Sequence, residues 1–117
     1  LLILLTTNGN GLPAVSFVNT ESKALCKGKQ NMITAIFKAG NIIIDQSHCI
    51  PSKFRFSKYS HNPSSSASRY FWFLDLSAGS EKLISMPDMS SCHQHVKRIE
   101  KDDQTAICAV TDQSQVN

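Results

Sequence analysis

The fold is decided by an aromatic stretch near the middle of the chain, residues 69–76, which read RYFWFLDL. A run that is almost continuously aromatic and aliphatic is typical of a strand whose two faces are both covered. We therefore predict a central strand here. A helix should pack on one face of its sheet, and a long loop should cover part of the other.

A helix is predicted over residues 20–39, where Asn19 or Thr20 can cap the first turn and Gly40 ends the last. Gly28 disfavours a helix by about 1 kcal/mol, so we expect the ordered helix to begin after it. Apolar side chains recur in this segment at spacings of three and four: Leu25, Met32, Ile33, Ile36 and Phe37. This stripe predicts the helix face that packs on the core.

A strand is predicted over residues 53–59, because Phe54 and Phe56 alternate there with polar side chains. Pro51 precedes this strand, at a position where its missing N–H does least harm. The serine-rich residues 60–68 have turn chemistry and are expected to form a surface loop.

The remaining segments complete an antiparallel meander. Residues 42–44 are either a brief edge strand or the exit from the helix, and residues 77–94 are a long connection. Two strands at 95–100 and 105–111, joined by the charged residues 101–104, form a closing hairpin. The predicted fold class is α+β, with one helix packed on an antiparallel sheet of about four strands.

Composition indicates one folded domain. The chain has 117 residues, of which 41% are apolar and 18% charged, so a disordered chain is disfavoured. The net charge of +3 permits a partner with phosphate or acidic groups without requiring one. We expect a monomer.

Four cysteines, Cys26, Cys49, Cys92 and Cys108, are spread widely without a C-x-x-C motif. In an oxidising compartment they predict two disulfides, whereas in the cytosol they would be four buried thiols. Three pairings can be formed. In an antiparallel meander Cys49 and Cys92 each precede a strand at the same end of the sheet, which favours Cys49–Cys92 together with Cys26–Cys108.

The chain starts with an apolar run, residues 1–5 (LLILL), followed by turn residues. We interpret residues 1–14 as a signal-peptide remnant, with the alternative of a disordered segment or a strand paired to the sheet edge. The domain would then cover residues 15–117. The run is far shorter than the roughly 20 residues of a transmembrane helix, so we expect no membrane partner.

The order of these elements resembles that of the small guanine-specific fungal ribonucleases over residues 20–112. The segment Ile50-Pro51-Ser52-Lys53-Phe54 is similar to the stretch that opens the first sheet strand of that family, and residues 96–111 resemble its final hairpin. The resemblance implies a microbial-ribonuclease-like scaffold. Members of the family cleave RNA beside guanine with a carboxylate base, a histidine acid, an arginine and a Tyr/His pair.

None of the catalytic positions implied by the resemblance carries the family's residue. The first histidine falls on Ser52, and the base falls on Phe71 or Trp72. The arginine falls near His95 and the acid histidine near Asp112. A scaffold kept without its catalytic residues resembles the ribonuclease-like secreted effectors of powdery mildew fungi. Ala24-Leu25-Cys26 stands where those effectors carry Tyr-x-Cys.

A basic surface is the second candidate site. We expect cations on neighbouring strands beside tyrosines, which suits a phosphate backbone and stacked bases; an ordinary solvated sheet face is the alternative. The candidate residues for RNA or a protein partner are Lys53, Arg55, Lys58, Tyr59, His61, Arg69, His95, Lys97 and Arg98.

Other chemistries have less support in the sequence. Cys92-His93-Gln94-His95 is dense in metal-capable side chains, but it lacks two further ligands at a familiar spacing, so we predict no metal and no cofactor. The predicted function is a secreted, non-catalytic effector or virulence protein of a plant-pathogenic fungus. It would bind a host protein, an RNA or both inside plant cells, and immune receptors would recognise it there.

Two alternatives stay open. The first is an active secreted guanyl-type ribonuclease with a rearranged site, in which His61 or His95 acts with Glu81 or Glu100. The second is a small disulfide-bonded extracellular inhibitor, which would share the same size and cysteine content.

Overall fold

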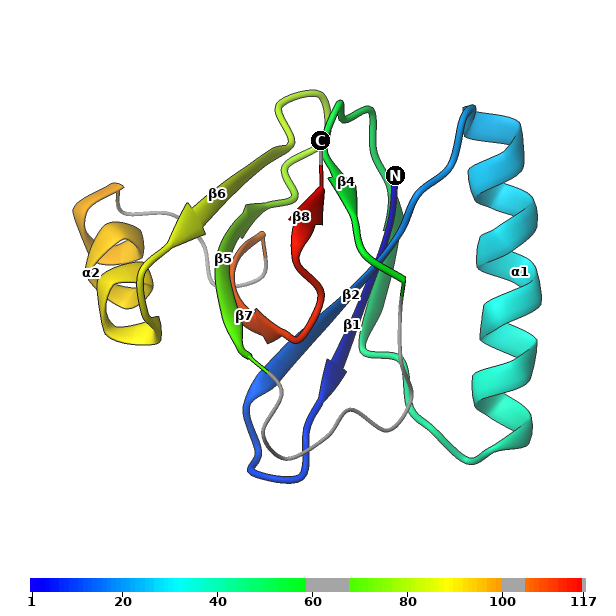
Figure 1. Ribbon diagram of the computed structural model, residues 1–117, viewed down its shortest axis with the longest axis horizontal. Coiled ribbons are helices and arrows are strands. Elements are labelled where there is room, and N and C mark those ends of the chain that lie inside the picture. The colour runs from blue at the N-terminus through cyan, green and yellow to red at the C-terminus, as the bar shows by residue number, and fades with distance from the viewer. Residues whose placement is uncertain (59–67, 100–104, 117) are drawn as a thin grey trace.

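The computed structural model describes residues 1–58, 68–99 and 105–116 (Figure 1). Its strands are β1 (Leu2–Thr7), β2 (Pro13–Val18), β3 (Gln46–Cys49), β4 (Arg55–Phe56), β5 (Tyr70–Asp75), β6 (Lys82–Met86), β7 (Ala106–Thr111) and β8 (Gln115–Val116). Its helices are α1 (Lys23–Ala39) and α2 (Met89–Ile99). The predicted α+β class is confirmed.

Six strands form one mixed sheet in the order β3-β1-β2-β7-β5-β6. Its neighbours are antiparallel except for β2 and β7, which run parallel with Ala14 opposite Val110. β4 and β8 pair with each other outside this sheet. The expected antiparallel sheet of about four strands is therefore corrected to a mixed sheet of six.

The apolar run at the start of the chain is an interior strand. β1 lies between β2 and β3, and Leu2 and Ile3 are fully buried. Successive side chains of a strand point to opposite faces, so a continuous apolar run is suited to a strand that is covered on both sides. Residues 1–14 are thus part of the folded sheet, and the edge position expected for this strand is occupied by β3.

One face of the sheet carries the larger core. Phe17 of β2 stacks on Phe56 with ring centroids 3.8 Å apart, and Trp72 of β5 meets both rings edge-on. Ile3 and Leu74 belong to the same buried cluster. The segment from Ile50 through β4 covers this face of the sheet. Its apolar side chains pack into the buried cluster and so hold the segment on the sheet.

The opposite face is covered by two helices at its two ends (Figure 1). α1 packs over β1 and β3, where Cys26 meets Leu2 and Leu4. α2 packs over β5 and β7, where Cys92 meets Phe73. The aromatic stretch at β5 is therefore covered on both faces, as its sequence predicts.

A buried glutamine joins the end of the chain to β2. The backbone N–H of Phe17 donates to Gln113 Oε1, and Gln113 Nε2 donates to the Phe17 carbonyl, each at 2.7 Å. The same Nε2 also donates to the Ser57 carbonyl at 2.7 Å. One side-chain amide thus satisfies both backbone groups of Phe17, in the way that a neighbouring strand would.

The second helix is the largest difference from the predicted fold. Residues 89–99 form α2, where a loop and the first strand of a hairpin were predicted, so Lys97 and Arg98 lie in a helix. Met89, Cys92 and Val96 recur at helical spacing and face the core, and Ser91 N–H donates to Asp88 Oδ1 at the start. The short alternating pattern at 95–100 is also compatible with this helical repeat. The segment forms a helix because the helix packs its apolar side on the core.

Four smaller expectations are also settled. α1 begins at Lys23 with Ser22 as its cap and continues through Gly28. Residues 42–44 are the exit from the helix, and the predicted long connection contains β6. The strand predicted at 53–59 is shorter in the structure. Among the described residues of this segment only β4 is a strand, and it pairs with β8. Most of the predicted loop at 60–68 and the turn at 101–104 lie outside the described residues.

Replacing Gln113 by Ala should destabilise the fold. The change leaves the N–H and C=O of Phe17 and the Ser57 carbonyl without their buried partner, so we expect the free energy of unfolding to fall by about 2–4 kcal/mol. The measurement is urea unfolding followed by tryptophan fluorescence. The exposed Gln115→Ala is the matched control and should stay within about 0.5 kcal/mol of the parent. Equal effects of the two variants would contradict this role of Gln113.

Removing residues 1–14 should abolish cooperative folding. The deletion takes away β1, which pairs with both β2 and β3. Side chains of β1 also belong to the buried clusters on both faces of the sheet. The near-ultraviolet signal of the buried Trp72 and its thermal transition report the outcome. If residues 15–117 melted cooperatively at the temperature of the full chain, they would form a domain without β1, as the signal-remnant interpretation expects.

Candidate interaction surfaces

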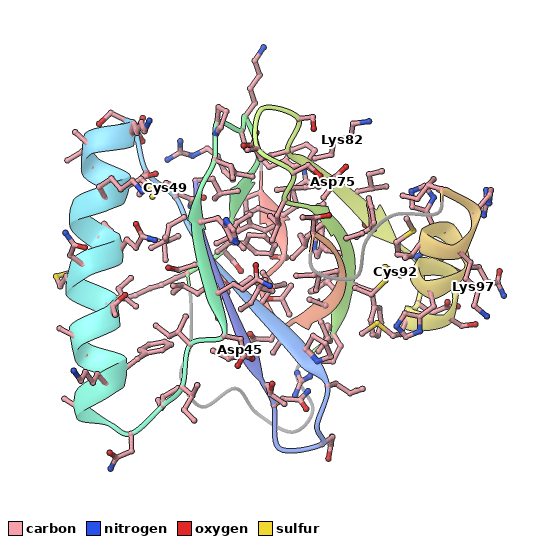
Figure 2. The ribbon with its side chains drawn as sticks, turned by 180° about the vertical axis from the view of Figure 1, so that it is seen from behind. Asp45, Cys49, Asp75, Lys82, Cys92 and Lys97 are labelled. Atoms are coloured by element: carbon pink, nitrogen blue, oxygen red, sulfur yellow. A yellow bond between two sulfur atoms is a disulfide. The ribbon has the colours of Figure 1, made fainter. Side chains whose placement is uncertain are left out.

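The cysteines are joined as Cys26–Cys49 and Cys92–Cys108 (Figure 2). Two disulfides were predicted and are present, but the pairing that the meander favoured is wrong. Cys49 lies on the edge strand beneath α1, and Cys92 lies on α2 above β7, so each helix is tied to the strand that it covers. The error follows from the missed helix, because the expected position of Cys92 at a strand entrance does not exist.

The predicted basic surface is divided between two parts of the molecule. Lys53, Arg55 and Lys58 are exposed in and around β4. Lys97 and Arg98 lie in the last turn of α2, at the end of the sheet opposite α1 (Figure 2). Neighbouring strands therefore do not assemble the expected set. Tyr59 and His61 lie outside the described residues.

Arg55 and His95 already have partners within the fold. The Arg55 guanidinium is 3.0 Å from the Glu21 carboxylate, which offsets its charge at the surface. The His95 ring packs edge-on against Phe73, with centroids 4.8 Å apart. Arg69 is exposed before β5, beside the partly exposed Tyr70.

The positions that the ribonuclease resemblance implies are not brought into one site. Trp72 and Phe73 lie on opposite faces of the sheet, so His95, which contacts Phe73, is separated by the sheet from Trp72. Phe71, the other position expected for the base, lies on the Phe73 face, because side chains alternate along a strand. The Ser52 hydroxyl accepts a hydrogen bond from the Phe54 N–H in the loop before β4.

The residues of the alternative ribonuclease site are likewise apart or undescribed. Glu81 precedes β6 and lines a cavity at the start of α1, whereas His95 lies on α2. Glu100 is outside the described residues, as is His61. Among the described residues, this set therefore provides no paired acid and base.

That cavity has a volume of about 510 Å³ and opens between the first turn of α1 and the chain after β3. Its charged lining is mixed, with Glu21 and Glu81 facing Lys23. In the described ranges no group of three potential ligands is placed to hold a metal ion, and no helix is long and apolar enough to cross a membrane.

The outer face of α1 is the surface that the sequence interpretation missed. Leu25, Met32 and Ile36 were expected to face the core, yet they are 56%, 49% and 53% exposed. Of the predicted stripe, Phe37 is buried at 3% exposed and the partly buried Ile33 faces the core. The helix contacts the sheet through Ile33 and Cys26, which is 1% exposed. The apolar residues of α1 occupy too wide an arc for one contact line, and only one side of that arc reaches the sheet.

Lysines border this outer face. α1 contains Lys23, Lys27, Lys29 and Lys38, all exposed, and its sequence has no acidic residue. Within the described part of the chain none of these lysines forms an ion pair. Ile42 and Ile43 follow the helix and are 41% and 78% exposed, which extends the apolar surface beyond its end. The signal available in the sequence was the repeated occurrence of apolar residues beside lysines along the predicted helix.

Comparison of the chain with protein-family models, curated proteins and solved structures finds no match. The candidate surfaces are therefore interpreted from their own chemistry.

Stability should fall in mild acid because of His48 on β3. Burial lowers the pKa of His48, Lys27 lowers it further, and Glu81 opposes them. The unfolded chain then binds a proton more readily than the folded one, so the free energy of unfolding decreases as the pH falls below about 6.5. Urea midpoints at pH 7.5 and pH 5 measure the effect.

His48→Gln should reduce the difference between those midpoints, and the exposed His93→Gln should keep it. An unchanged difference in His48→Gln would show that another group causes the loss in acid.

Proposed function

We propose that the protein is a secreted, non-catalytic effector-type protein on a ribonuclease-like scaffold and that it acts by binding a host protein. The observation that carries this proposal is the outer face of α1, where Leu25, Met32 and Ile36 are exposed in one row. Exposed apolar patches of this kind mark sites of protein association in soluble domains.

The two disulfides support the secreted part of the proposal. Such bridges form and persist in oxidising compartments, and each stabilises a small domain by roughly 2–4 kcal/mol. The scattered placement of His95, Glu81 and Ser52 supports binding over hydrolysis, since general acid–base cleavage needs two groups on opposite sides of one phosphate. A protein partner is favoured over RNA because the described cations that the sequence suggested for RNA are divided between the region of β4 and the last turn of α2.

Export should yield a fully oxidised protein that does not cut RNA. We expect the intact mass of protein recovered from culture medium to be four hydrogens below that of its reduced form, since both bridges are closed. Incubation with guanine-containing RNA should give no cleavage above buffer. Guanine-specific cleavage that is lost in His95→Ala or Glu81→Gln would instead establish the ribonuclease alternative. Four free thiols would overturn the proposal that the protein is secreted.

The binding activity itself is tested by reconstitution. A protein cross-linked to this chain in a plant extract must form the same complex again when the two purified components are mixed. Failure of every captured protein to do so, combined with salt-sensitive retention on RNA, would assign the protein to RNA binding instead.

A further inference from the structure

The outward side of α1 carries a regular row of two large and three small residues. Leu25, Gly28, Met32, Ala35 and Ala39 follow one another at spacings of four and three, and all are exposed. At 3.6 residues per turn they lie within an arc of about 80°. We call this row the outer seam. Rows with this spacing are what a second helix packs against, with large side chains entering the gaps beside small ones.

Packing within the protein's own fold does not require a glycine at position 28. A Cβ atom built at this position meets nothing within 4 Å, and the backbone is helical. Glycine in a helix interior is nonetheless unfavourable compared with alanine. A residue that weakens the helix and leaves open space above it suits the close approach of another backbone.

The charges beside the outer seam specify the partner. Lys29 lies on one side of it, and Lys38, Lys27 and Lys23 lie on the other. A second copy of this chain, packed seam to seam, would place lysines against lysines and would be opposed by their repulsion. A partner with acidic side chains on both borders of its apolar stripe would be attracted.

A lipid surface fits the same charges less well. The middle of the outward side is formed by Gly28, Ala35 and Ala39, which bury little apolar area in a bilayer. Small residues in that place favour close contact between helices instead.

We propose that the outer seam of α1 is the docking site for an amphipathic helix of the host protein, one that has small and aliphatic residues along its contact stripe and glutamate or aspartate on both borders. This proposal rests on the proposed function and names the chemistry of its partner. The Cys26–Cys49 bridge and the packing of Cys26 and Ile33 against Leu2 hold α1 on the sheet, so the seam is presented on an anchored helix.

The probe for this proposal is a pair of synthetic helical peptides of about 20 residues, a length that supports an isolated helix. Both carry Leu and Ala along one stripe, and the borders are Glu in one and Lys in the other. Fluorescence anisotropy should show roughly tenfold tighter binding of the Glu peptide, with the difference shrinking as salt rises. Equal binding of the two, or no binding of the Glu peptide, overturns the proposal, as does stronger binding to phosphatidylserine vesicles than to the Glu peptide.

Variants at Gly28 separate docking from folding. Gly28→Ala should raise the folding equilibrium constant about fivefold, because the added methyl group meets open space. Gly28→Leu should fold normally and lose binding of the Glu peptide at least tenfold. Asn31→Leu, on the exposed helix side next to the seam, is the matched control and should keep binding within about twofold. A destabilising Gly28→Ala would show that the glycine serves the fold itself.

The reconstituted host complex distinguishes this proposal from the proposed function. Met32→Glu and Gly28→Leu should each weaken the complex at least tenfold, while Lys82→Ala on β6 should not. A complex that re-forms equally well with both seam variants leaves the proposed function standing and refutes the seam. If no complex re-forms with the parent protein, the proposed function itself fails.

Discussion

The fold depends on the parallel pairing of β2 with β7, because this pairing joins two halves that are otherwise separate in the sheet. One half contains β3, β1 and β2, and the other contains β7, β5 and β6. The Gln113 amide continues the join by bonding both backbone groups of Phe17, where β7 has already ended. Phe17, Phe56 and Trp72 then pack across this join. The aromatic core therefore stabilises the contact between the two halves of the sheet, as the strand pairing does.

The two halves use the same device to hold a helix, with different results. α2 covers the end of its half through Cys92, Val96 and Met89. α1 touches the sheet along a narrower line, and its apolar surface continues outward beyond that line. A 17-residue helix that is anchored by a disulfide and by the packing of Cys26 and Ile33 can carry exposed aliphatic residues without depending on them for its own stability.

The sequence predicted the class of the fold and a strand at β5 that is covered on both faces. The central position expected for that strand is wrong, because β5 lies next to the edge strand β6. Where a segment fitted both a helical and a strand period, the sequence did not decide between them. The run around Trp72 and Phe73 is apolar at every position. This pattern is typical of a strand that is covered on both faces. Residues 1–5 have the same character but also suit an export signal, which their composition cannot separate from a strand. For α1, the buried side is chosen by the position of the sheet edge and by Cys49, and neither is visible as hydrophobicity. The exposed row was therefore expected in the core. Lys97 and Arg98 of the predicted basic surface were expected on a strand and lie in α2.

Each cysteine is bridged to its nearest neighbour along the chain, the first to the second and the third to the fourth. Chain synthesis into an oxidising compartment would deliver Cys26 and Cys49, which are 23 positions apart, well before Cys92 emerges. The first bridge can close while the second half is still being made, and the second needs a span of only 16 residues. Oxidation in the order of emergence would therefore give the native pairing without any exchange of partners.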